Sequence, residues 1–151
     1  MNVPTTPFDT YYGRFLISDN KHRLDPMYVY ELLCTPKPNS NGVPDRRFPV
    51  IINHSLSFGV YDGKYQIGYC RVITDHSEFA TIWDVFIDEA YRKKGIGHAL
   101  ITAVMENPKL KEVYRWFLMT QDRHSLYEKF GFKREHYNPY SMMYLNPNGN
   151  S

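Results

Sequence analysis

The sequence predicts a mixed α/β (α+β) fold, with a mostly antiparallel central sheet flanked by helices in one domain of 151 residues. Two strand-like runs meet at Asp62-Gly63, a dipeptide typical of hairpin turns. Residues 79–87 are almost wholly apolar, as expected of a strand covered on both faces, and residues 96–105 repeat apolar side chains at helical spacing. These three features together indicate the fold class.

Upstream of the hairpin, the chain predicts one or two leading helices. Asp25 is placed to cap a helix over residues 25–33, because its carboxylate accepts from free N–H groups and Pro26 fits the first turn. Residues 46–55 follow a loop rich in Pro, Asn and Ser. They form either a second helix capped by Asp45 or a strand, and the helix is the preferred interpretation.

After the apolar strand and its helix, the pattern alternates again between strand and helix. Residues 113–119 predict another central strand. Asp122 is placed to cap a short helix that Gly131 closes in the left-handed conformation. Two final strands are predicted around a turn at Asn138-Pro139. The expected order is therefore three strands, a helix, a strand, a helix and two strands, behind the leading helices.

Composition and charge argue against a nucleic-acid or membrane partner. The 18 Lys and Arg residues against 16 Asp and Glu leave a net charge of +2, which is too balanced for binding to DNA, RNA or an acidic membrane. No apolar run approaches the roughly 20 residues of a spanning helix, and the start lacks a signal-peptide pattern. We expect a cytoplasmic monomer or homodimer whose ends fray near residues 1–7 and 146–151.

The two cysteines, Cys34 and Cys70, lie far apart in the chain, with no partner at metal-ligand spacing. We expect free, buried thiols in a reducing compartment, with a disulfide between them as the alternative. No metal site is predicted.

An unusual segment lies between the apolar strand and its helix. Residues 92–97, with the sequence RKKGIG, place three cations directly before two glycines, although like charges repel and glycines weaken a helix start. A phosphate-binding turn explains them, because glycines let backbone N–H groups approach an anion at the start of a helix. A dinucleotide-binding turn would need a third glycine, and a P-loop would need Gly-Lys-Ser/Thr. A solvated loop is the remaining alternative, and the cations favour the anion site.

These residues resemble motif A of the GNAT acetyltransferase superfamily, whose pattern is Arg/Gln-x-x-Gly-x-Gly/Ala. Residues 125–132, SLYEKFGF, are similar to a second signature of the family, a short helix that carries a Tyr and ends in Gly-Phe. The two motifs stand in the family's order, separated by one helix and one strand. The resemblance covers about residues 56–145.

The resemblance implies an acyl-CoA-dependent N-acyltransferase with acetyl-CoA as co-substrate. The backbone of residues 85–87 would hold the pantetheine arm like an added strand, and residues 92–98 would hold the pyrophosphate. The cofactor-binding residues implied in this way are Val85, Phe86, Ile87, Arg92, Lys93, Lys94, Gly95, Ile96, Gly97 and His98.

Two residues are candidates for the proton transfers of amine acylation. The resemblance places Tyr127 near the CoA sulfur, where its hydroxyl would act as general acid; a ring that only packs is the alternative. Asp84 is the one charge in the apolar strand and the candidate base, because some family members carry an acid there. A hydrogen-bonded structural acid is the alternative for Asp84. Weaker candidates for the base are Glu78, His76, His124 and bulk water.

The acceptor is expected to be a primary amine of a small molecule or an amino terminus. Direct attack in a ternary complex is expected, because neither cysteine has the neighbours of an acyl-accepting nucleophile. Two other functions stay open: a non-catalytic acyl-CoA-binding sensor or scaffold, and a nucleotide-binding protein that uses the same turn. The acceptor would meet the leading helices and the last hairpin, with candidates Tyr28, Tyr30, residues 35–45 and Tyr137 to Tyr140.

Overall fold

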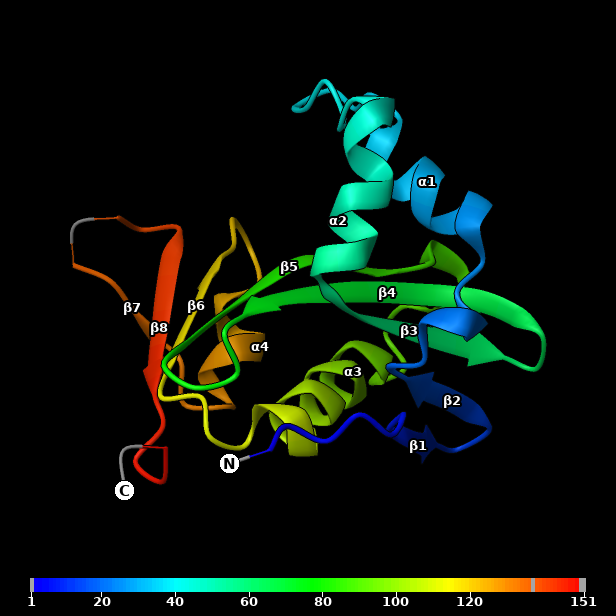
Figure 1. The fold of residues 1–151 in the computed structure, drawn as a ribbon. Helices are drawn as coiled ribbons and strands as arrows, with labels where there is room; N and C mark the ends of the chain where they lie inside the picture. The colour runs from blue at the N-terminus through cyan, green and yellow to red at the C-terminus, as the bar shows by residue number, and fades with distance from the viewer. Residues whose placement is uncertain (1, 137, 150–151) are drawn as a thin grey trace.

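The computed structural model describes residues 2–136 and 138–149, and its centre is an eight-stranded sheet (Figure 1). The strands lie in the order β1-β2-β3-β4-β5-β6-β8-β7, and β5 and β6 form the parallel pair among otherwise antiparallel neighbours. The predicted mixed, mostly antiparallel sheet is confirmed. The strands are β1 (Asp9–Tyr12), β2 (Phe15–Ser18), β3 (Leu56–Asp62), β4 (Tyr65–Thr74), β5 (Phe79–Ile87), β6 (Arg115–Met119), β7 (Lys133–Arg134) and β8 (Ser141–Leu145).

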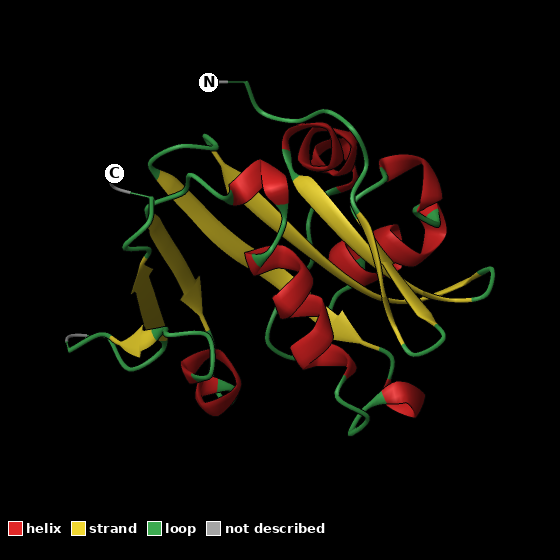
Figure 2. Ribbon diagram, turned by 90° about the horizontal axis from the view of Figure 1, so that it is seen from below, coloured by secondary structure: helices red, strands yellow, loops and turns green. Residues whose placement is uncertain are grey.

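Helices cover both sides of the sheet, α1 and α2 on one side and α3 and α4 on the other (Figure 1). Figure 2, seen from the α3 side, shows this helix crossing the strands. Leu100 and Val104 of α3 are fully buried in one core cluster with Ile82, Trp116 and Leu118 of β5 and β6. This packing fixes α3 beside the middle of the sheet. The helices are α1 (Pro26–Cys34), α2 (Phe48–His54), α3 (Ile96–Met105) and α4 (His124–Glu128).

The two leading helices are confirmed, but only the first has its predicted cap. Asp25 Oδ1 accepts from the backbone N–H groups of Met27 and Tyr28, at 3.0 and 3.3 Å. Asp45 does not cap α2, because it lies in a 3₁₀ turn before the helix. Its carboxylate instead accepts from the hydroxyl of Tyr30 at 2.7 Å.

Two further local predictions are corrected. Asp122 does not cap α4: the helix begins after Arg123 without a side-chain cap, and the Asp122 carboxylate lies 3.9 Å from the Arg123 guanidinium. The β3–β4 hairpin turns one residue later than predicted, because Asp62 is still paired with Tyr65. The turn therefore starts at Gly63, whose φ of 58° suits glycine.

The structure begins with a hairpin of β1 and β2 that was not predicted, because the predicted order begins with helices. The two strands pair around Gly13, which has a φ of 57°. Each strand has four residues, too few to show a clear alternation, and the buried hydrophobic side chains are Phe15 and Ile17 of β2. The hairpin is stabilised by β3, which pairs with β2.

The strand at residues 79–87 has its predicted bounds, but the expectation that both faces are covered is wrong. Ala80 and Ile82 are buried, whereas Phe79 and Trp83 on the other face are 42% and 38% exposed. One face of β5 is therefore accessible.

The carboxyl-terminal segment is tied to the sheet at its first residue. Asn146 donates from its backbone N–H to Tyr114 O at 2.7 Å, and from Nδ2 to Val113 O at 3.1 Å. Predictions that concern Met1, Tyr137 and residues 150–151 fall outside the described residues.

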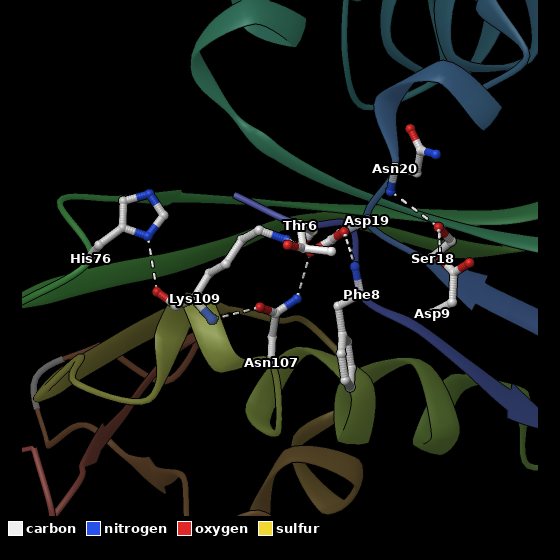
Figure 3. Close-up of polar contacts among 9 residues, drawn as sticks. All are labelled: Thr6, Phe8, Asp9, Ser18, Asp19, Asn20, His76, Asn107 and Lys109. Carbon is white, nitrogen blue, oxygen red and sulfur yellow. Dashed lines mark hydrogen bonds and ion pairs between the residues drawn. The ribbon is translucent and has the colours of Figure 1, made fainter. Parts of the chain in front are cut away.

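A buried polar network joins the amino-terminal segment to the end of α3 (Figure 3). Lys109 Nζ lies 2.5 Å from Asp19 Oδ2 and donates to Thr6 O at 2.8 Å. Asn107 Nδ2 donates to the same carboxylate oxygen at 2.8 Å, and Phe8 N donates to Asp19 Oδ1 at 2.7 Å. Asp19 is 5% exposed, so its charge depends on these donors rather than on water.

We expect Lys109→Met to lower the free energy of unfolding by about 3 kcal/mol, because the Asp19 carboxylate would stay buried without its cation. Urea denaturation measures the loss. As a control, Arg134→Met removes the ion pair of Arg134 with Glu128, whose side chains are 61% and 48% exposed, and should cost less than about 1 kcal/mol. Equal losses in the two variants would contradict the role given to the network.

Candidate active site

The site lies where β5 and β6 part. Their parallel pairing ends at Ile82 and Leu118, although β5 continues to Ile87. On its other edge β5 remains paired with β4 up to Ile87 opposite Gly68, with an irregularity at Asp84. Asp84 has a φ of 56°, a left-handed conformation that bulges the strand. One edge of β5 beyond Asp84 is therefore free of a neighbouring strand.

A cleft of about 720 Å³ lies at this parting. It brings together residues from β5, from the turn before α3, from the end of β6 and from α4. The predicted site residues that line it are Asp84, residues 85–87, Arg92, Lys93, residues 95–98 and Tyr127.

The turn before α3 has the geometry of an anion site. Lys93 and Gly95 adopt left-handed conformations, with φ of 62° and 83°, and bend the chain into the helix at Ile96. The first N–H groups of a helix have no acceptor within the helix and lie at the positive end of its dipole. A Cβ built at Gly97 would meet no atom within 4 Å, so packing within the protein does not require this glycine. The open space can receive an anion close to the backbone.

Arg92 and Lys93 both line the cleft, and Arg92 is held in place. Its Nε donates to Ile87 O at 2.9 Å, and its guanidinium carbon lies 5.3 Å from the ring centre of Phe86. Lys94 does not line the cleft, and its Nζ lies 5.8 Å from the ring centre of Tyr91. Its predicted part in phosphate binding stays a prediction.

The outer side of the turn is held by two hairpins. The hydroxyl of Tyr12 in β1 donates to Lys94 O at 2.7 Å, and the hydroxyl of Tyr91 donates to Asp62 Oδ2 at 2.8 Å. Arg14 Nε lies 3.0 Å from Asp62 Oδ1. Hydrogen bonds from Arg14 and Tyr91 lower the pKa of Asp62, so this carboxylate is ionised at neutral pH. Two observations favour glycine at position 95: its backbone is left-handed, and a Cβ there would lie 2.5 Å from the Tyr12 hydroxyl oxygen.

Tyr127 is positioned by the end of its own helix. The backbone N–H groups of Phe132 and Gly131 bond to the carbonyls of Tyr127 and Glu128, at 3.3 and 3.1 Å, and Gly131 has a φ of 92°. This is a Schellman ending, which also brings the Phe132 ring edge-on to Tyr127 at 6.1 Å. The side chain is 5% exposed, and burial raises the pKa of Tyr127 to about 12. The hydroxyl is therefore a proton donor at neutral pH.

The Asp84 carboxylate forms an ion pair with the Arg71 guanidinium. Arg71 Nε donates to Asp84 Oδ2 at 2.5 Å, and Arg71 Nη1 donates to Ser55 Oγ at 3.2 Å. The Asp84 side chain keeps 30% of its surface exposed and lines the cleft. Cys70, which is fully buried, has its pKa raised by burial and by Asp84, so its thiol is neutral.

The weaker candidates for a base have partners elsewhere and do not line the cleft. Glu78 is ion-paired with Arg115 at 2.8 Å. His76 Nδ1 lies 3.0 Å from Lys109 O, and His124 Nε2 lies 2.7 Å from Pro139 O. Asp84 is therefore the predicted base that the structure brings to the site.

The tyrosines predicted to meet the acceptor are mostly engaged in the protein. The Tyr28 hydroxyl donates to Asp88 Oδ1 at 2.6 Å, and burial raises the pKa of Tyr28. The Tyr30 hydroxyl donates to Asp45, as described above. Tyr140 is 51% exposed, and Tyr137 falls outside the described residues.

Several residues join the site that the sequence did not single out. Trp83 and Met119 line the cleft where the strands part, and Tyr12 and Asp62 hold the turn from behind. The position of Met119 depends on the parallel pairing of two distant strands, and the bonds to the turn span 82 and 29 residues. A local pattern therefore gives no signal for them.

Within residues 2–136 and 138–149, no cluster of three or more His, Cys, Asp and Glu side chains is arranged to hold a metal ion. Across the same residues, no helix has the length and apolar character needed to cross a membrane.

Comparison with known sequences identifies the family. A family model described as an acetyltransferase (GNAT) domain matches residues 53–134, more than half of the chain. A histone acetyltransferase of Glycine max is 32% identical over 73 residues, which are 48% of this chain and 32% of that protein. A chloroplastic GCN5-related N-acetyltransferase of Arabidopsis thaliana is 30% identical over 73 residues, 28% of its length. The chain spans about a third of the length of these curated relatives.

Solved structures agree with this match. A GNAT-family protein of Xanthomonas campestris pv. campestris is 32% identical, with a TM-score of 0.73 over 83% of this chain and 94% of that one. A GNAT acetyltransferase of Elizabethkingia anophelis with acetyl-CoA bound shares the fold, with 16% identity and a TM-score of 0.59 over 93% of this chain and 97% of that one. The sequence motifs, the parted strands and these matches lead to one conclusion: the chain belongs to the GNAT family of acetyltransferases.

Proposed function

We propose that this chain transfers an acetyl group from acetyl-CoA to a primary amine of a small molecule or an amino terminus, by direct attack in a ternary complex. The observation that carries the proposal is one cleft that joins an anion-binding helix start to an open strand edge. CoA has the matching parts, a pyrophosphate and an extended pantetheine arm with amide groups. The strand edge at residues 85–87 and the turn at residues 92–98 would thus serve the two parts of one ligand.

The residues of the cleft divide the binding of acetyl-CoA between them. The backbone at residues 95–98 and the side chains of Arg92 and Lys93 would neutralise the pyrophosphate. The edge of residues 85–87 would pair with the pantetheine amides as a strand does. The thioester would then lie toward the parting of the strands, near Tyr127 and Asp84.

An ammonium substrate loses one proton before attack and a second after the C–N bond forms; one proton reaches the sulfur, and the other leaves to solvent. A free amine attacks the thioester carbonyl, the new C–N bond forms, and the C–S bond breaks as CoA departs. Asp84 would accept the proton of the amine, and Tyr127 would donate to the thiolate and recover its proton from solvent. The burial that raises the pKa of Tyr127 keeps that proton available throughout the neutral range.

Direct attack is favoured because the chain's thiols are unsuited to carry an acyl group. Cys70 is fully buried, and burial raises the pKa of Cys34 as well. A neutral thiol is a poor nucleophile. Both cysteines are free, which fits our proposal that the protein functions in a reducing compartment such as the cytoplasm.

Binding of CoA to the turn can be tested by thermal unfolding. Acetyl-CoA or CoA at about 100 times its Kd should add roughly 2.7 kcal/mol and raise Tm by several degrees, whereas ATP and NAD should not. Gly97→Ala should fold at least as stably as the wild type, since alanine favours helices and meets open space, yet show a much smaller CoA shift. A shift with ATP or NAD alone would indicate a nucleotide-binding protein. If the Tm shift with CoA is as large in Gly97→Ala as in the wild type, the pyrophosphate does not bind at this turn.

Tyr127→Phe should lower kcat by about 100-fold or more, because the departing thiolate loses its proton donor. The thermal shift with CoA should stay as in the wild type, which separates chemistry from binding. Tyr144→Phe is a matched control, since Tyr144 also packs on Phe132, at 5.7 Å, but does not line the cleft. Its kcat should be unchanged. CoA binding without turnover in the wild type would favour a non-catalytic sensor.

Asp84→Asn should slow acetylation most at low pH, where the amine, with a pKa of about 10, is most fully protonated and depends on a base. Asn tolerates the left-handed backbone and still offers an oxygen to Arg71, so the bulge should persist. The effect is measured as the rate of CoA release from about pH 6 to 9, because most amines are protonated in this range. A constant ratio of mutant to wild-type rate across that range would argue against Asp84 as the base.

A further inference from the structure

One face of the sheet is apolar and exposed on β5, β6 and β8. The inward face of these strands is buried under α3, with Ala80, Trp116 and Met142 among the core residues. The outward face carries side chains that are 38–49% exposed at Phe79, Trp83, Met119 and Leu145. We name this the open face, and it consists of Phe79, Trp83, Phe117, Met119, Met143 and Leu145. Thr81, between Phe79 and Trp83, is 8% exposed, and Arg115 lies between Phe79 and Leu145.

The pairing register makes the open face one continuous surface. Thr81 of β5 lies opposite Phe117 of β6, and Phe117 lies opposite Met143 of β8. Side chains directly opposite each other on neighbouring strands are in contact range. The exposed apolar residues therefore gather across three strands rather than standing singly, which marks a surface used for binding.

The open face is continuous with the cleft. Trp83 and Met119 belong to both, and each follows the last paired residue of its strand, Ile82 or Leu118. The cleft thus opens onto the face at the parting of β5 and β6. A molecule lying on the face has its end at the cleft mouth, where the proposed function places the thioester.

Two of the charged groups beside the face are paired, whereas Lys133, opposite Met143, is exposed and belongs to none of the ion pairs of the described residues. Arg71, opposite Trp83, is held by Asp84, and Arg115, opposite Phe79, is held by Glu78. The face therefore offers mainly apolar contact to an incoming molecule. A polyamine or a sugar gains little there, whereas a ring or a branched aliphatic group buries apolar area.

We propose that the acceptor is a primary amine carried on an apolar, ring-sized group, which lies on the open face with its amino group at the mouth of the cleft. This inference rests on the proposed function and names its acceptor class. The alternative is that a second copy of the chain binds to the open face. It would also cover Trp83 and Met119 and close the cleft mouth, so the continuity of face and cleft favours the amine.

The test compares 2-phenylethylamine with ethylamine at saturating acetyl-CoA, with release of the CoA thiol as the readout. Burial of the phenyl group should raise kcat/KM by about tenfold or more. Trp83→Ala should lower the ratio of the two kcat/KM values about tenfold, because it removes the ring at the cleft mouth. Tyr65→Ala removes a ring that is 65% exposed outside the open face, and should leave the ratio unchanged.

Tryptophan fluorescence gives a second readout, because the chain has two tryptophans and Trp116 is 1% exposed. Titration of the CoA-saturated protein with 2-phenylethylamine should shift the emission of Trp83 to shorter wavelength. Trp83→Phe should abolish that shift.

Three results would overturn the inference. Equal kcat/KM for the two amines, or a ratio unchanged in Trp83→Ala, would contradict it while the transferase function stands. An emission that depends on protein concentration without amine would mean that a second copy covers the face. Release of no thiol with either amine from a protein that shows the CoA thermal shift would contradict this inference alone, whereas no thiol release and no CoA shift would contradict the proposed function as well.

Discussion

The parting of β5 from β6 is the constraint on which the rest of the site depends. The pairing with β6 ends at Ile82, and two residues later the left-handed backbone of Asp84 bulges the strand, while the other edge stays paired with β4. Such a conformation costs about 1–3 kcal/mol in a residue other than glycine, and Asp is among the residues that tolerate it best. The ion pair with Arg71 offsets part of that cost. One residue thus shapes the cleft and carries its carboxylate.

The cleft is assembled from parts that are each fixed by packing elsewhere. The core cluster around Leu100 and Val104 fixes α3, so the free N–H groups at its start are held without needing a ligand. The Schellman ending of α4 fixes Tyr127 through Gly131 and Phe132. Pre-arranged groups of this kind need little reorganisation when a ligand binds or reacts.

Much of this arrangement could be predicted from the sequence where the signal is local. The cap at Asp25 and the left-handed Gly131 each act on their own neighbours, and both predictions are confirmed. The predicted caps at Asp45 and Asp122 were wrong. Asp45 accepts a hydrogen bond from a tyrosine 15 residues away, and α4 has no side-chain cap.

What could not be predicted depends on distant pairing. The direction of the Lys94 side chain depends on Tyr91. The exposure of Trp83 depends on where α1 packs, because its buried residues cluster with Tyr69 of β4 and not with β5. Neither of these two features produces a local pattern in the sequence. The acceptor surface is therefore a property of the folded sheet rather than of a motif.

The hairpin of β1 and β2 lies outside the segment that the family model matches, but it contacts the turn before α3. That segment begins at residue 53, yet the phosphate turn is held by Tyr12, and by Asp62 with the help of Arg14. A shortened chain cut at the limits of that segment would retain both signature motifs and lose the outer support of one of them. The two strands nearest the amino terminus thus support the turn before α3 from outside the matched segment, so an excised domain should include them.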